Sequence, residues 1–202
     1  MMKKQIIVPA LAILFMAATV EAQESFRLDH RNSEITVKGT SSVHDWEMKA
    51  TAMSAKIEVK SNGSGLDEIV NVSFSMPTEK LTSDNNIMNK KSWDALKSNK
   101  HDNIMFDLTS VSGFNSNGST FSGTAFGTLT IAGKTKAVSI PFSGNTGNNN
   151  ALVVSGEEKI NMKDYNVSPP TAMLGTLKTG EEVTVDFNMK FIPESRYTEL
   201  IN

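Results

Sequence analysis

The chain contains no cysteine. This absence excludes disulfide bonds, thiolate metal sites, cysteine-held iron–sulfur clusters and catalysis by a thiol. The sequence also has neither the Gly-x-Ser-x-Gly nucleophile turn of many hydrolases nor a phosphate-binding glycine loop. The common routes to hydrolysis and nucleotide chemistry are therefore unsupported.

A long apolar run is missing as well. The only charge-free apolar stretch near the start, 6–18, follows Lys3 and Lys4 and is too short for a comfortable membrane span. Small residues at Val20 and Ala22 occupy the −3 and −1 positions of a cleavage site after Ala22. We therefore predict a cleaved signal peptide and a protein that is periplasmic or secreted, without stable membrane insertion. An uncleaved N-terminal anchor is the alternative.

The remaining chain has no excess of basic residues. The signal peptide would occupy 1–22 and leave one domain at 23–202. The full chain has 20 basic and 22 acidic residues; without two lysines and one glutamate of the leader these fall to 18 and 21, a net charge of −3. Nucleic acids and anionic membranes attract basic surfaces, so we expect neither as a partner. A domain exported without disulfides must be stabilised by its own packing, which favours a bacterial envelope.

Alternation of apolar and polar residues is the dominant pattern that is present. In 182–191 every second residue is apolar, and the residues between them are polar or charged. A period of two is typical of a β-strand with one buried and one solvated face. The pattern recurs at 70–76, 104–108, 138–142 and 152–162, with turn signals between the runs. We therefore predict an all-β chain of antiparallel strands.

Two segments depart from simple alternation. The apolar residues of 46–52 and 53–59 lie on opposite parities, which predicts a bulge or a sharp bend near Ala52. A helix is predicted after Ser83, whose side chain can cap the first turn, with Lys97 placed favourably near the helix end.

Closure of the sheet is expected because an open antiparallel sheet leaves unpaired edges. We predict an antiparallel lipocalin-like β-barrel of about eight strands with one attached α-helix, whose interior is either filled or holds one ligand. Strand parity and the large aromatic rings give a set of candidate ligand-binding wall residues. These are Trp46, Met48, Val70, Val72, Phe74, Met76, Trp93, Phe106, Leu129, Ile131, Ile140, Phe142, Val185, Phe187 and Met189. A two-sheet sandwich with the same residues packed as a solid core is the alternative.

Several segments are similar in order and spacing to one known family. The most characteristic are Gly-Thr-Ser-Ser-Val-His-Asp-Trp at 39–46 and Gly-Thr-Leu-Thr-Ile-Ala-Gly-Lys-Thr-Lys at 127–136, within a similarity that extends from Phe26 to Phe191. On these segments the chain resembles the YceI-like family of exported lipid-binding barrels. The resemblance implies a lipocalin-like barrel that encloses a polyisoprenoid or quinone-like tail, with no cofactor and no catalytic residues to carry over.

Few polar residues are candidates for chemistry. Each of the 3 histidines is next to an aspartate, but neighbours on a strand point to opposite faces, so no pair is a chelate and we expect no metal site. Glu157 and Glu158 are interpreted as charges at the edge of a turn. The histidines are His30, His44 and His101.

The sequence therefore favours a non-enzymatic function. We expect an exported carrier whose partner is a long-chain apolar molecule, with oligomerisation left open. One alternative is a structural or partner-binding envelope protein with a filled core. A less favoured one is an enzyme that acts on an apolar substrate, which would need ionisable groups inside the cavity.

Overall fold

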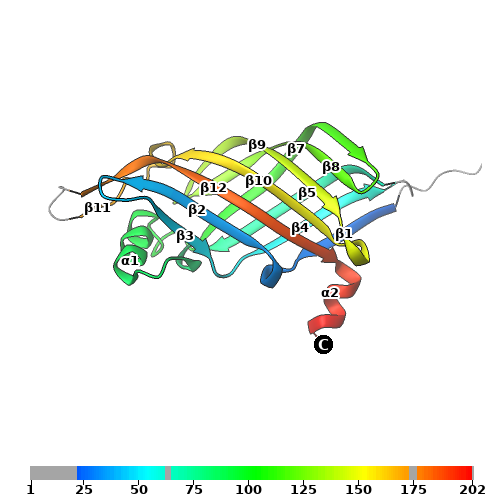
Figure 1. The fold of residues 1–202 in the computed structure, drawn as a ribbon, viewed down its shortest axis with the longest axis horizontal. Coiled ribbons are helices and arrows are strands. Elements are labelled where there is room, and N and C mark those ends of the chain that lie inside the picture. Colours follow the sequence, from blue (N-terminus) through cyan, green and yellow to red (C-terminus); the bar gives the residue numbers. More distant parts are fainter. Residues whose placement is uncertain (1–21, 62–64, 173–176, 202) are drawn as a thin grey trace, which may run out of the picture.

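The computed structural model describes residues 22–61, 65–172 and 177–201 of the chain. They form an elongated barrel of long antiparallel strands with a helix against one end (Figure 1). The predicted signal peptide lies outside the described residues, apart from Ala22, which begins the first strand.

Strands make up most of the described chain. They are β1 (Ala22–Leu28), β2 (Glu34–Ser41), β3 (Trp46–Ala50), β4 (Ser54–Ser61), β5 (Leu66–Pro77), β6 (Leu81–Thr82), β7 (Asn103–Asn117), β8 (Thr120–Ile131), β9 (Lys134–Thr146), β10 (Leu152–Asn161), β11 (Thr171–Ala172) and β12 (Leu177–Pro193). The α-helices are α1 (Asn86–Ala95) and α2 (Glu194–Ile201), and the short 3-10 helices are η1 (His30–Asn32), η2 (Thr78–Lys80), η3 (Asn148–Asn150) and η4 (Met162–Tyr165).

The strands follow one another around the barrel. β1 and β2 act as one interrupted strand, because β12 pairs first with β2 and then with β1. β3 and β4 likewise pair with β2 and β1, and β6 and β5 pair with β3 and β4. The result is a closed antiparallel barrel of eight long strands, which confirms the predicted fold and overturns the sandwich. The helix α2, which continues from the last strand, was not predicted.

A phase break marks the interruption of the second long strand. β3 ends at Ala50 and β4 begins at Ser54, so the bend predicted near Ala52 lies between them. The residues that face inward therefore switch from even to odd numbers at this point, while the chain continues in the same direction.

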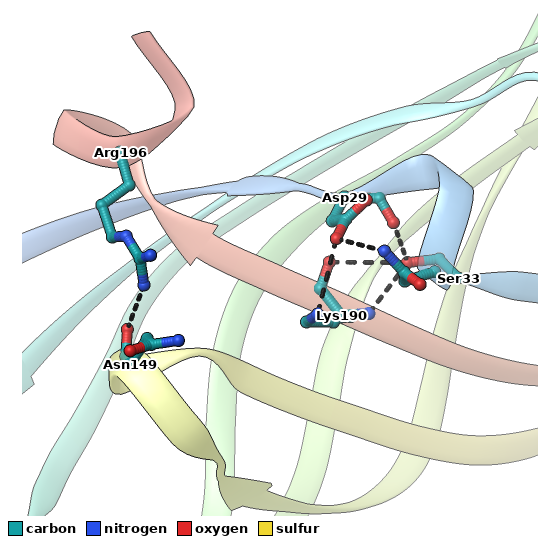
Figure 2. A network of polar contacts seen from close by, with 6 residues as sticks. Asp29, Ser33, Asn149, Lys190 and Arg196 are labelled. Carbon is teal, nitrogen blue, oxygen red and sulfur yellow. Dashed lines mark hydrogen bonds and ion pairs between the residues drawn. The ribbon is translucent and has the colours of Figure 1, made fainter. Parts of the chain in front are cut away.

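A polar network bridges the interruption between β1 and β2 (Figure 2). The Ser33 hydroxyl donates to the Asp29 carbonyl at 2.8 Å and accepts from the backbone N–H of Lys190 in β12 at 2.9 Å. The Asp29 backbone N–H donates to the Lys190 carbonyl at 2.8 Å. Side-chain and backbone groups thus replace the ladder hydrogen bonds that the interruption removes. In the same view, Arg196 of α2 donates to the Asn149 carbonyl.

The barrel interior is packed solid at the end opposite α1. Buried residues there include Phe26, Val59, Leu66, Phe121 and Leu152. Rings close this end in a row: the Phe121 centroid is 6.3 Å from that of Phe114 and 6.5 Å from that of Phe142. This packed end forms a floor beneath the remaining interior.

Candidate ligand-binding site

A cavity of about 530 Å³ occupies the barrel interior between the floor and α1. A volume of this order suits a small-molecule ligand. Phe142, Val154 and Phe191 line its lower part, whereas Val43, Ile87 and Lys178 line its mouth. Most of the wall is aliphatic or aromatic, so the cavity favours an apolar guest.

The predicted wall residues line this cavity, with two exceptions. Those that line it are Trp46, Met48, Val72, Phe74, Met76, Phe106, Leu129, Ile131, Ile140, Phe142, Val185, Phe187 and Met189. They come from strands on all sides of the barrel, so strand parity identified an inward face that is continuous around the axis. Their contact with a ligand stays a proposal.

Val70 is the first exception. In the β4–β5 pair, Glu58 faces Asn71 while the next residue, Val59, faces Ile69, so Val70 is an extra residue without a partner. This β-bulge reverses the parity of β5 at that point. Ile69 lines the cavity instead, and Val70 is 38% exposed on the outside. The prediction for Val70 was wrong because alternation alone does not reveal a bulge.

Trp93 is the second exception. It lies on α1, and its indole N–H donates to the Leu81 carbonyl at 2.9 Å. The ring therefore fastens the helix to β6 and does not line the cavity. A large amphipathic ring was consistent with either role.

Helix α1 forms part of the cavity wall at the mouth. Met88, Ser92, Ala95 and Leu96 line the cavity with a spacing of three and four residues. The helix is capped by Asn85, whose side-chain oxygen accepts from the N–H groups of Ile87 and Met88, and not by Ser83 as predicted. The sequence did not indicate this inner face because the apolar residues of the helix form an irregular stripe.

Two lysines tie the helix to the far side of the mouth. Lys91 donates to the Thr171 carbonyl at 2.5 Å, and Lys97 donates to the Asn166 carbonyl at 3.1 Å. These bonds link α1 to β11 and to the chain that follows η4. The helix is thereby held at the open end of the barrel (Figure 1).

The turn between β2 and β3 forms the opposite lip of the mouth. The Ser41 hydroxyl accepts from the N–H groups of Val43 and His44, which fixes a tight turn. The Trp46 indole donates to the Thr40 carbonyl at 3.0 Å and so holds its ring at the wall. Val43 at 62% and Ile87 at 70% are the most exposed large apolar side chains of the described chain, and both line the mouth.

Aromatic rings lie over glycines on the inner surface. A side chain added at Gly39 would meet the Trp46 ring at 2.2 Å, and one added at Gly156 would meet the Phe187 ring at 2.5 Å. Both are direct cross-strand pairs. The glycines leave room for the rings at the wall, and this packing keeps large side chains out of the barrel axis.

Glu158 faces into the cavity. It lies within β10 opposite Val185, on the same face as the buried Val154 and Ile160. The interpretation of Glu158 as a turn-edge charge was therefore wrong, although its neighbour Glu157 does point outward and is exposed. The signal that the sequence offered was parity, which places Glu158 with the apolar residues of its own strand.

The histidines occupy separate places, on η1, at the mouth and at the end of the α1 segment. Across the described ranges, no three histidine, aspartate or glutamate side chains come together as metal ligands would. Neither described helix is long and apolar enough to cross a membrane.

A closed eight-stranded antiparallel barrel around an apolar cavity defines the lipocalin-like class of fold. Within that class, the model of the YceI-like domain matches residues 26–191, and the chain belongs to this family. The resemblance recognised in the sequence is thus confirmed. No curated protein matches the chain.

Solved structures share the fold at low sequence identity. A polyisoprenoid-binding domain from Saccharophagus degradans, implicated in plant cell wall breakdown, is 12% identical with a TM-score of 0.66 and covers 84% of this chain and 99% of its own. BcnA of Burkholderia cenocepacia is 15% identical with a TM-score of 0.64, over 81% and 98% of the two chains. The YceI protein of Campylobacter jejuni is 17% identical with a TM-score of 0.56, over 71% and 82%.

Proposed function

We propose that this chain is an exported carrier that encloses one long apolar molecule, a polyisoprenoid or quinone-like lipid, in the barrel cavity. The observation that carries the proposal is the apolar cavity of about 530 Å³ with its mouth beside α1. Each CH₂ group buried there contributes about 0.8 kcal/mol, so an extended hydrocarbon tail gains affinity along its length. The polyisoprenoid-binding domain with the same fold gives independent support for this ligand class.

The alternative of a filled structural barrel fits less well. A barrel that only stabilises itself has no need for open volume between its inward side chains, since close packing is the more stable arrangement. Catalysis on an apolar substrate is also less favoured: among the described residues Glu158 is the one carboxyl group that lines the cavity, and burial raises the pKa of the Tyr165 hydroxyl to about 12, which suits it poorly as an acid or base near neutral pH.

The first test is to identify what the mature protein retains on purification. Solvent extraction followed by mass spectrometry is expected to release a long-chain lipid, and native mass spectrometry is expected to show one lipid per protein chain. A delipidated protein that takes up no long-chain lipid would contradict the proposal.

A matched pair of variants separates binding in the cavity from adsorption on the surface. Ala125 lines the cavity from β8, whereas Ala137 is exposed on the outer face of β9. Ala125→Phe is expected to fill part of the cavity and weaken lipid binding about tenfold, equivalent to about 1.4 kcal/mol. Ala137→Phe adds the same ring outside and is expected to leave the affinity unchanged. Equal effects of the two substitutions would contradict binding inside the barrel.

A further inference from the structure

One acidic side chain breaks the apolar character of the cavity wall well inside the mouth. Glu158 is level with Val185, and through it with Val37 and Met48 on the following strands. The row nearer the mouth contains Val183, Gly39 and Trp46 by the same register. Glu158 therefore lies two residues deeper in the barrel than Trp46, away from the lysines at the mouth.

A second polar group accompanies it. Tyr165 of η4 also lines the cavity, and its residue is only 3% exposed. Burial, with smaller contributions from the charges of Asp164 and Glu158, raises the pKa of the Tyr165 hydroxyl to about 12. The tyrosine therefore stays neutral and can donate a hydrogen bond in the cavity at any physiological pH.

Both polar groups are available for hydrogen bonds to a ligand. Within the described part of the chain, neither the Glu158 carboxyl nor the Tyr165 hydroxyl has a hydrogen-bond partner. The basic side chains that line the cavity belong to the mouth: Lys91 donates to the Thr171 carbonyl, the His44 ring is hydrogen-bonded to the Asp45 carbonyl, and Lys178 is exposed. Among the buried side-chain oxygen and nitrogen atoms of the described residues, Asp186 Oδ2 alone lacks a hydrogen-bond partner, so the Glu158 carboxyl and the Tyr165 hydroxyl border the open volume of the cavity, where a polar group of a ligand can reach them and form the missing hydrogen bonds.

The chemistry of the pair restricts what that partner can be. A carboxyl group in an apolar wall favours its neutral form, in which it can both donate and accept a hydrogen bond. A phosphate or carboxylate head at this position would meet a like charge or force the carboxyl to stay protonated. An ammonium head would require two opposite charges to leave water together, which often costs as much as their attraction returns. An uncharged head avoids both costs.

We infer that Glu158 and Tyr165 form a polar anchor inside the cavity for an amphiphile with an uncharged hydrogen-bonding head, such as a hydroxyl, carbonyl or amide on a long apolar tail. The inference rests on the proposed carrier function and narrows its ligand class. The two residues recognise the head within the barrel and exclude phosphorylated forms of the same lipid from this position.

The test uses probes that share one tail and differ only in the head. Geranylgeraniol, geranylgeranyl phosphate, geranylgeranylamine and the corresponding hydrocarbon are to be compared on the delipidated full domain by displacement of a fluorescent apolar dye. The alcohol is expected to bind at least about tenfold more tightly than the phosphate, because the anion is repelled or must leave water unpaired. It is also expected to bind more tightly than the amine and the hydrocarbon.

Three variants assign the preference to Glu158. Glu158→Leu is expected to weaken binding of the alcohol about fivefold, the loss of one net hydrogen bond, while the hydrocarbon binds as well or better. Glu158→Gln keeps a neutral hydrogen-bonding group and is expected to retain the alcohol and to bind the phosphate more tightly than the parent does. Glu157→Leu, on the exposed side of the same strand, is the control and is expected to leave all four affinities unchanged.

The outcomes separate this inference from the carrier function. If the hydrocarbon binds but the alcohol shows no preference over the phosphate, or if Glu158→Leu preserves the order of the heads, the inference is overturned and the carrier function stands. If the amine binds most tightly, Glu158 acts as an anion and the inference is likewise wrong. If none of the probes binds, the carrier function itself fails.

Discussion

At the scale of single residues, the openness of the cavity depends on glycines that face aromatic rings. Gly39 is directly opposite Trp46, and the atoms that a new side chain would meet there all belong to the indole ring. The ring, which is also held by its bond to the Thr40 carbonyl, must therefore move if the glycine is replaced. Its position at the wall thus requires a residue without a side chain at position 39.

Gly39→Ala is expected to push the Trp46 ring toward the cavity mouth. The expected results are a shift in tryptophan fluorescence, weaker lipid binding and a loss of about 1–3 kcal/mol in the free energy of unfolding, typical of overpacking. Gly147→Ala is the control, since the nearest atom to an added side chain there is 3.7 Å away. Unchanged fluorescence and affinity in Gly39→Ala would mean that the indole is not held at the wall by this contact.

Glu158 gives a prediction about the pH dependence of stability. Burial raises the pKa of its carboxyl in the folded protein above the ordinary value of 4.5. The folded state then binds the proton more tightly than the unfolded state, so stability falls as the pH rises from 4.5 through the folded pKa. Glu158→Gln removes this loss.

The expected result for Glu158→Gln is a higher free energy of unfolding than the parent at pH 7, with the difference shrinking toward pH 4.5. Urea denaturation at the two pH values measures it, and Glu157→Gln on the exposed face serves as the control. A difference that does not change with pH would show that the carboxyl titrates normally in the folded protein.

Strand parity placed most of the candidate wall residues on the face that lines the cavity, and its failures have specific causes. It assigned Phe74 and Phe187 to the cavity wall, but it failed at Val70, where a bulge shifts the register. It could not assign Trp93, which lies on a helix. Glu158 was misassigned for a different reason: its charge was given more weight than its parity.

At the scale of elements, helix α1 controls the mouth. Its start depends on Asn85, whose side-chain oxygen accepts from Ile87 N–H at 2.9 Å and from Met88 N–H at 3.1 Å. Met88 lines the cavity in the first turn of the helix. Fraying of this turn would therefore open the cavity to solvent.

Asn85→Ala is expected to cost about 1 kcal/mol of stability by removing the cap. It is also expected to speed lipid dissociation, because the first turn would open more often; stopped-flow transfer to acceptor vesicles measures this rate. Asn86→Ala, at the exposed first residue of the helix, is the matched control. An unchanged dissociation rate in Asn85→Ala would mean that the lipid leaves by another route.

The elements themselves were largely predictable, whereas their ends were not. Long alternating runs indicated β5, β7, β10 and β12, because a half-buried strand requires that pattern. The start of α1 was placed at Ser83 because serine and asparagine both cap helices well. The interruption at η1 was missed, since it is stabilised by contacts with the distant Lys190, which no local pattern contains.

At the scale of the whole molecule, the barrel divides into a packed end and a hollow end. Both ends have apolar inward residues at the same spacing, so the sequence could predict the inner face but not whether the side chains meet across the axis. The difference arises from three-dimensional packing, in which Phe121 contacts rings on neighbouring strands while Phe106 faces open volume. Stability and binding are therefore expected to depend on different residues.

A pair of identical truncations tests this division. Phe121 is 4% exposed and is surrounded by Phe114 and Phe142, so Phe121→Ala is expected to cost about 3–5 kcal/mol through lost contacts and a new internal void. Phe106 is half-buried and already borders the cavity, so Phe106→Ala leaves fewer lost contacts and is expected to cost about half as much.

Lipid binding should follow the opposite order. Phe106→Ala alters the wall directly and is expected to change affinity for a long-chain lipid, whereas Phe121 does not line the cavity and touches its wall through Phe142, so Phe121→Ala is expected to change affinity much less at temperatures where it is folded. Urea denaturation and dye displacement on the same samples measure both quantities. Equal stability losses would mean that the hollow end is packed in solution as tightly as the floor, because a ring that borders open volume cannot lose as many contacts as one enclosed on all sides.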